Sequence, residues 1–155
     1  MRLLLVLFLT IASIGVSATN KTLDIGLFWN DEPREIVVQP GDGSYTLLGN
    51  GQEILKVKKE TIVRLKVENG LIHLRTITAD LGVFGEVEFK RNTWGSSLKI
   101  QRTDHDKKLH EYHDEFVIKP FSGKLRIINH VYIENYVSGV VESEAGSKEP
   151  KEYYK

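Results

Sequence analysis

The chain contains 155 residues, in which 21 Lys and Arg balance 21 Asp and Glu, and it has no cysteine. The balanced charge argues against a nucleic-acid partner, because nucleic-acid-binding domains carry a basic surplus. The lack of cysteine excludes a disulfide scaffold and lipidation on a cysteine, so the fold depends on its hydrophobic core.

Residues 1–18 have the pattern of a secretory signal peptide. Arg2 gives a positive start, residues 3–16 form an almost unbroken apolar run, and Val16-Ser17-Ala18 offers small residues at the spacing that a signal peptidase needs. The run is too short to span a bilayer, which disfavours the alternative of a membrane anchor. We therefore expect an exported protein that works in the periplasm or the cell-wall space. No later segment approaches membrane length, so no integral membrane segment is expected after signal removal.

Residues 19–155 are enough for one domain and not for two. As far as about Asn129 they consist of short β-type runs separated by turn signals. Gly49-Asn50-Gly51 and Asn69-Gly70 predict two hairpins, because the residues of these turns can take positive φ. A charged, histidine-rich connection is expected at 104–114. The expected strands are 23–29, 35–38, 45–48, 54–57, 62–67, 71–77, 83–90, 97–101, 115–119 and 124–128.

The hydrophobic period then changes to that of a helix. Apolar side chains recur at the spacing of one helix face, which predicts an amphipathic helix of about nine residues whose stripe packs on the sheet. Gly139 in its middle costs about 1 kcal/mol relative to Ala, and we expect a close approach of another backbone to explain it. The stripe consists of Ile133, Tyr136, Val137, Val140 and Val141.

A second helix is predicted to start at Pro150, a residue favoured at the first helical position. Only six residues remain, too few for a helix on its own, so we expect the chain to be truncated within a structural element. The sequence thus predicts a β-dominated α+β fold. It consists of antiparallel strands and hairpins, one short amphipathic helix and the start of a second.

The last third of the chain carries a family resemblance. Tyr112 to Ile118 reads YHDEFVI, Ser122 to Asn129 reads SGKLRIIN, and Val131 to Glu144 reads VYIENYVSGVVESE. These strings resemble the stage II sporulation protein D / amidase enhancer (SpoIID/LytB) family. Its hallmark is a hairpin that ends in a short apolar strand and Asn, a helix reading Glu-x-Tyr-apolar-x-Gly-Val-Val, and then x-Ser-Glu.

The chain departs from the family at two places. Many relatives have Met after the glutamate, where Ala145-Gly146-Ser147 stands here. The family also continues with Lys-Ala-Gln-Ala-Val and an Arg-Thr pair on the next helix, of which only Tyr154-Lys155 is present. We therefore expect residues 19–155 to be the N-terminal portion of a SpoIID/LytB-like domain, inactive as it stands.

The resemblance implies work on peptidoglycan. Some members resemble lytic transglycosylases that cut glycan strands stripped of stem peptides, and others stimulate a cell-wall amidase. In the cleaving members a glutamate after this helix is the proposed acid/base, and the motif places it at Glu144. The expected partners are therefore peptidoglycan glycan strands and a cell-wall amidase, without a cofactor.

The helical register supplies a separate argument for Glu144. It lies four residues beyond Val140 and seven beyond Val137, on the apolar side, whereas Glu142 follows Ser138 on the polar side. Apolar surroundings raise the pKa of a carboxyl group by desolvation, so it stays protonated and can donate to a leaving oxygen. The plain alternative for Glu144 is a local hydrogen bond or salt bridge at the helix end. For Glu142 and Glu134 we expect a solvated helix face.

Two other groups of residues have side chains suited to binding. The segment from 104 to 113 contains His and Asp side chains of the kind that bind metal ions. Lysines interrupt the segment, which has the composition of a charged loop, so we expect no metal site there. Trp94 would suit sugar stacking if exposed, but an aromatic filling the core at a turn is commoner, and we expect that for Trp94 and Trp29. The cluster with metal-ligand chemistry consists of Asp104, His105, Asp106, His110 and His113.

Three functions remain open from the sequence. The first is lytic-transglycosylase-like cleavage of peptide-free glycan strands by the intact parent, with Glu144 as acid/base. The second is a non-catalytic module that binds the wall or enhances an amidase. The third is a secreted β domain that shares only the family's fold.

Overall fold

The computed structural model describes residues 21–104 and 108–145, with side chains described as far as residue 141. The predicted signal peptide at 1–18 and the predicted second helix from Pro150 lie outside the described residues. Within the described ranges, no helix is both long and apolar enough to cross a bilayer.

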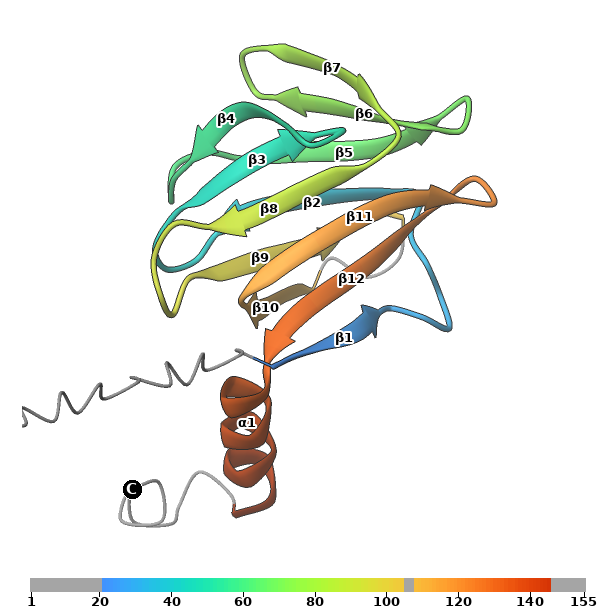
Figure 1. Ribbon diagram of the computed structural model, residues 1–155. Helices are drawn as coiled ribbons and strands as arrows, with labels where there is room; N and C mark the ends of the chain where they lie inside the picture. Colours follow the sequence, from blue (N-terminus) through green and yellow to red (C-terminus); the bar gives the residue numbers. More distant parts are fainter. Residues whose placement is uncertain (1–20, 105–107, 146–155) are drawn as a thin grey trace, which may run out of the picture.

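Short strands dominate the described chain, and one helix follows them (Figure 1). The strands are β1 (Thr22–Leu27), β2 (Glu35–Pro40), β3 (Tyr45–Gly49), β4 (Gln52–Val57), β5 (Val63–Glu68), β6 (Leu71–Thr76), β7 (Asp80–Phe84), β8 (Val87–Arg91), β9 (Ser97–Arg102), β10 (Leu109–His113), β11 (Glu115–Phe121) and β12 (Lys124–Tyr132). The helix is α1 (Ile133–Ala145). The predicted β-dominated α+β fold is thus confirmed.

The strands form two six-stranded antiparallel sheets. The first has the order β1-β12-β11-β8-β3-β4, and the second has the order β10-β9-β2-β5-β6-β7. Side chains from both sheets form one buried core, in which Phe89 and Phe116 of the first sheet and Leu65 and Ile100 of the second are at most 1% exposed. The two sheets therefore pack face to face as a sandwich.

Both predicted hairpins are confirmed. Asn50 and Gly51 join β3 to β4 with φ values of 50° and 78°, and Asn69 and Gly70 join β5 to β6 with φ values of 52° and 78°. Two successive residues at positive φ match the twist of the flanking strands, which explains the Asn-Gly pairs.

The strand predictions differ from the structure at two places. The run at 83–90 is interrupted by a turn, so that its first part extends β7 and its second part forms β8. The charged connection at 104–114 contains β10, which pairs with β9. Its side chains alternate between half-buried and exposed. Because most of them are charged or polar, this alternation does not appear as a hydrophobic period in the sequence.

The helix is present, but its predicted packing is wrong for the described side chains. It runs for 13 residues, and Tyr136, Val137, Val140 and Val141 are 38–52% exposed. A side chain at Gly139 would meet no atom within 4 Å, so no close backbone explains this glycine. The physical reason is that Ile133 follows the last residue of β12 directly. Without a loop the helix cannot fold back onto the sheets, and it projects from the sandwich (Figure 1).

Candidate functional site

The start of α1 is fixed to the sheets by Asp114, which joins β10 to β11. Arg91 Nη1 donates a hydrogen bond to Asp114 Oδ1 at 2.6 Å, and the backbone N–H of Tyr132 donates to Oδ2 at 3.1 Å. The Asn135 amide donates to both carboxylate oxygens, at 3.0 and 2.9 Å. A carboxylate is favourable at a helix N-terminus, where unpaired N–H groups leave a partial positive charge. Asp114 therefore sets the direction in which α1 leaves the sandwich.

Arg91, at the end of β8, lies against two aromatic rings. Its guanidinium carbon is 4.1 Å from the centre of the Trp94 ring and 4.0 Å from that of Tyr132. The two rings meet edge to face, with centres 5.2 Å apart. The Arg91 side chain is 9% exposed and that of Asp114 is 0% exposed, so the ion pair is buried. The charge of Arg91 is thus neutralised by Asp114 and covered by the rings.

The backbone around Asp114 is held by two further buried side chains. The Tyr45 hydroxyl donates to the Asp114 carbonyl at 2.9 Å. Burial, followed by the nearby Asp114 charge, raises the pKa of Tyr45 far above its ordinary value, so this hydroxyl remains a donor. The Asn129 amide donates to the carbonyls of His113 and Glu115, at 2.8 and 3.0 Å. We call Arg91, Tyr45, Asp114, Asn129 and Asn135 the junction.

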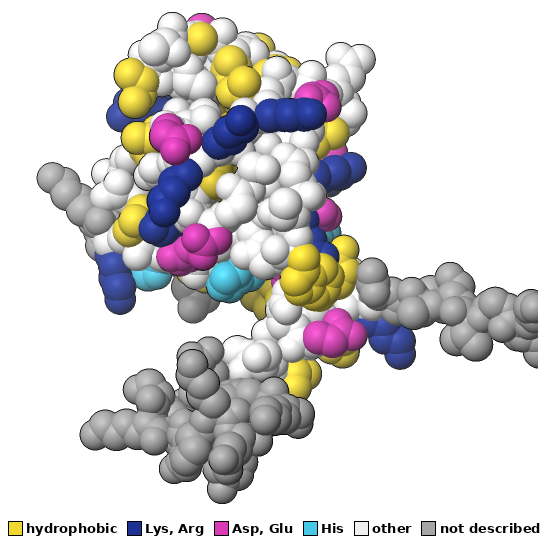
Figure 2. All heavy atoms as spheres, turned by 90° about the vertical axis from the view of Figure 1, so that its left-hand side faces the viewer, with side chains coloured by type: hydrophobic (Ala, Val, Ile, Leu, Met, Phe, Trp, Pro, Cys, Tyr) yellow, Lys and Arg dark blue, Asp and Glu magenta, His cyan; other side chains and the backbone are white. Residues whose placement is uncertain are grey.

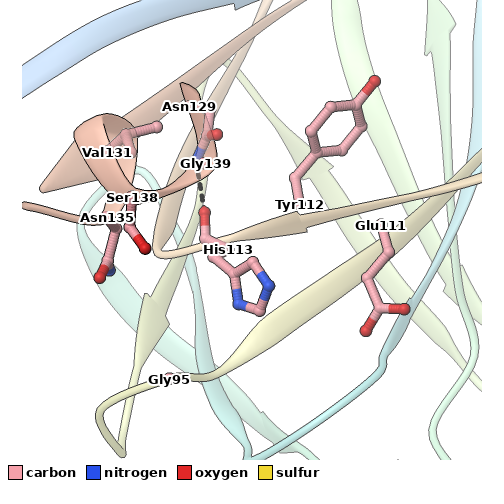
Figure 3. A pocket seen from close by; sticks show the side chains of 9 residues that line it. All are labelled: Gly95, Glu111, Tyr112, His113, Asn129, Val131, Asn135, Ser138 and Gly139. Atoms are coloured by element: carbon pink, nitrogen blue, oxygen red, sulfur yellow. Dashed lines mark hydrogen bonds between the residues drawn. The ribbon is translucent and has the colours of Figure 1, made fainter. Parts of the chain in front are cut away.

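A cleft of about 420 Å³ opens beside the junction (Figure 3). One wall is formed by the end of β12 and the beginning of α1, the other by β10, and Gly95 of the turn between β8 and β9 completes it. Glu111 and His113 point to the same side of β10, whereas Tyr112 points to the other (Figure 3). The cleft therefore combines a carboxylate and an imidazole with the polar face of α1, where Asn135 and Ser138 lie.

The candidate metal cluster is not assembled in the described residues. His110 and His113 lie three apart on β10 and therefore face opposite sides of the sheet. His113 lines the cleft, whereas His110 lies in ring contact with Phe28 and Tyr112. Within 21–104 and 108–145, no group of three or more His, Asp or Glu residues could hold a metal ion. His105 and Asp106 lie outside these ranges.

A second set of titratable side chains lies away from the cleft, on β5, β6 and β7. His73 Nδ1 lies 3.2 Å from a Glu68 oxygen, and Nε2 lies 2.8 Å from an Asp80 oxygen. Hydrogen bonds from Lys66 and His73 lower the pKa of Glu68. The Gly82 N–H and then His73 lower the pKa of Asp80. The set is internally paired, and we assign it a role in holding the edge strand β7.

Both tryptophans are exposed, so the expectation that they fill the core is wrong. Trp94 is 65% exposed and Trp29 is 62% exposed. Each indole lies against an arginine instead, Trp94 against Arg91 at 4.1 Å and Trp29 against Arg126 at 4.9 Å. The alternative of an indole available for sugar stacking is the one that fits this exposure.

The predicted catalytic residue, Glu144, lies in the last turn of α1. Its side chain is outside the described ones, but the helical register places position 144 on the exposed stripe, four residues after Val140. The helix residues that line the cleft are Asn135, Ser138 and Gly139, and position 142 rather than 144 continues that face. The register therefore puts position 144 on the opposite side of the helix from the cleft.

Sequence reasoning missed the ion pair at the centre of the junction. Arg91 and Asp114 are 23 residues apart: Arg91 follows the predicted strand 83–90, and Asp114 ends the charged connection predicted at 104–114. One signal was available, since Asp114 interrupts two β-type runs and adopts a φ of 73°, a conformation that Asp tolerates better than most residues. Comparison of the chain with protein-family models, with curated proteins and with solved structures gives no match.

Proposed function

We propose that this chain belongs to an exported cell-wall protein of the SpoIID/LytB type that takes part in peptidoglycan remodelling. The intact parent would cleave peptide-free glycan strands in the manner of a lytic transglycosylase. The observation that supports work on a glycan is that residues of the segment carrying the resemblance, from 129 to 139, form one wall of the cleft, while position 144 lies on the other face of α1. Five residues of this segment line the cleft: Asn129, Val131, Asn135, Ser138 and Gly139.

The structure gives the hallmark asparagine a structural role. Asn129, which ends the short apolar strand of the hallmark, donates to the backbone carbonyls on both sides of Asp114. A polar side chain that satisfies buried groups is costly to replace, because the groups it leaves behind lose their partners. One residue of the hallmark thus holds the backbone that positions the helix beside the cleft.

In the proposed reaction Glu144 acts as the single acid/base. Its protonated carboxyl group donates to the glycosidic oxygen as the bond to the anomeric carbon breaks. The carboxylate then takes the proton from the 6-hydroxyl of the same sugar, whose oxygen closes an anhydro ring. No water is consumed, so the second carboxylate that hydrolytic glycosidases use to activate water is not needed.

The proposed reaction requires the apolar stripe of α1 around position 144 to be shielded from water. A carboxyl group keeps its proton near neutral pH when desolvation raises its pKa. The described neighbours of position 144, Val137, Val140 and Val141, are 38–52% exposed. The reaction therefore requires that this stripe be covered when the strand is cleaved.

The test is an assay for anhydro-sugar ends with peptide-free glycan strands and the protein as its gene encodes it. Glu144→Gln should abolish these ends, because an amide cannot transfer the proton. Glu134→Gln is the matched control, since Glu134 is exposed on another face of the same helix. Unchanged product formation by Glu144→Gln would remove the catalytic assignment.

A non-catalytic wall-binding or amidase-enhancing module is the second candidate. The exposed indole of Trp94 favours it, because an exposed aromatic ring suits sugar binding without any acid/base group. Such a module would retain an amidase in a pull-down, or retain wall glycan, and would be indifferent to Glu144→Gln. Retention without anhydro-sugar formation would therefore select this candidate.

A further inference from the structure

We propose that the cleft beside the junction binds an uncharged N-acetylated sugar unit of a glycan chain, with a sugar ring stacked on the open face of Trp94. This inference rests on the proposed wall function and adds to it a binding place separate from Glu144. Gly95, the residue after Trp94, lines the cleft, so Trp94 belongs to the turn that borders it.

The Trp94 indole is exposed and yet fixed. Arg91 lies 4.1 Å from the ring centre on one face, and Tyr132 meets the indole edge to face. Arg91 in turn is held by its 2.6 Å bond to buried Asp114. Since Trp94 is nevertheless 65% exposed, its other face is open. A rigid open ring binds a flat partner with a small loss of conformational entropy.

The charges around the cleft select an uncharged ligand. The two rings do not recruit a second cation on the face that Arg91 covers, because Arg91 already lies over both Trp94 and Tyr132. An anion would find the nearby cations already paired, since Arg91 is neutralised by Asp114 and Lys99 lies 3.9 Å from the Glu111 carboxylate that lines the cleft. Stacking sites for single-stranded nucleic acid instead combine aromatic rings with a positively charged groove. A sugar ring that carries hydroxyl and N-acetyl groups fits these limits.

The cleft also offers hydrogen-bonding groups that the junction does not use. The side chains of His113 and Ser138 are exposed, and neither has a hydrogen-bond partner among the described residues. They can donate to and accept from sugar hydroxyl and N-acetyl groups. Figure 2 shows a hydrophobic patch on this side of the molecule, where the sandwich meets the helix, with histidine and acidic side chains beside it. The volume of about 420 Å³ falls in the range of small-molecule sites, roughly 300–1,000 Å³.

The experiment measures binding of N-acetylglucosamine oligomers by titration calorimetry. Trp94→Ala should weaken binding about tenfold or more, as expected for loss of an aromatic anchor. Trp29→Ala is the matched control, because Trp29 is similarly exposed at 62% and also lies against an arginine. Equal weakening by the two variants, or no binding by the wild-type chain, would overturn the inference. So would preference for a polyanion such as single-stranded DNA.

A second variant keeps the test valid if Trp94→Ala disturbs the junction. Gly139 lines the cleft, and a side chain added there meets no atom within 4 Å. Gly139→Leu should therefore fill part of the cleft without strain, and leucine is the better helix former. We expect binding to fall about tenfold while the circular dichroism spectrum and melting temperature are kept. Undiminished binding by folded Gly139→Leu would place the sugar elsewhere.

Failure of this binding inference can be distinguished from failure of the proposed cleavage function. Anhydro-sugar ends are scored in parallel with binding. Binding that depends on Trp94 without any cleavage would overturn the transglycosylase proposal alone. Cleavage by the protein as its gene encodes it, without binding that depends on Trp94, would overturn this inference alone.

Discussion

The first turn of α1 and the turns after it are stabilised in different ways. The first turn is held by the buried carboxylate of Asp114, which accepts hydrogen bonds from Arg91, Tyr132 and Asn135. The later turns carry Val137 and Val140, which are 52% and 40% exposed. One end of the helix is therefore fixed by polar contacts, while its apolar face has no described partner.

This difference shows what an amphipathic pattern does and does not specify. The pattern determines which side chains share a face, and the residues of the α1 stripe do so. Whether that face is covered depends on the direction of the helix, which the junction and the direct β12-to-α1 connection set.

The largest effect is expected at the buried ion pair. Asp114→Asn keeps a residue type that tolerates the φ of 73° but leaves the guanidinium of Arg91 without its counter-charge. We expect a loss of about 3–5 kcal/mol in the free energy of unfolding, measured by urea denaturation.

Arg64→Gln is the matched control for this variant, since the Arg64–Glu35 pair is exposed on its Arg64 side, at 58%. It should cost at most about 1 kcal/mol. Similar losses in both variants would show that the junction does not depend on its charge pair.

An intermediate effect is expected at Asn129. Asn129→Ala leaves the carbonyls of His113 and Glu115 without their donor, at an expected cost of about 1–3 kcal/mol. Asn129→Asp should cost more, because a carboxylate oxygen would then face two carbonyl oxygens. Asn92→Ala serves as the control, since Asn92 is exposed and bonds to Thr46 and Ser44. If the two alanine variants lose equal stability, Asn129 does not hold the backbone around Asp114.

Much of the fold could be predicted because the signals are local. Asn50-Gly51 and Asn69-Gly70 specify their turns through residues that accept positive φ. Val63 and Leu65, at most 1% exposed, alternate with exposed Arg64, as expected for a strand with one buried face. These features depend on neighbours a few residues away, which a single sequence displays directly.

The candidate site could be predicted only in part, because it depends on contacts between distant segments. The resemblance drew attention to Asn129, which the structure brings to the junction, but not to Asn135, which holds Asp114 beside it. Nothing local marks Arg91 as the partner of Asp114. The exposure of Trp94 follows from the arginine beneath it, and the strand character of β10 follows from pairing with β9. Tertiary contacts decide both features.

The smallest effect is expected on the stripe of α1. Val137→Gln and Val140→Gln should change the free energy of unfolding of this chain by less than about 0.5 kcal/mol, because both side chains are already largely in water. Leu125→Ala is the contrast, since Leu125 is 0% exposed and its truncation should cost about 2–5 kcal/mol.

The same stripe variants connect stability to the proposed reaction. If the stripe is covered in the full product of the gene, Val137→Gln and Val140→Gln should destabilise that product while leaving the 155-residue chain unaffected. A loss of 2 kcal/mol or more in the 155-residue chain itself would mean that the stripe is already packed there. Position 144 would then already lie beside covered apolar side chains, and the condition that the proposed reaction places on the stripe would be met without any further partner.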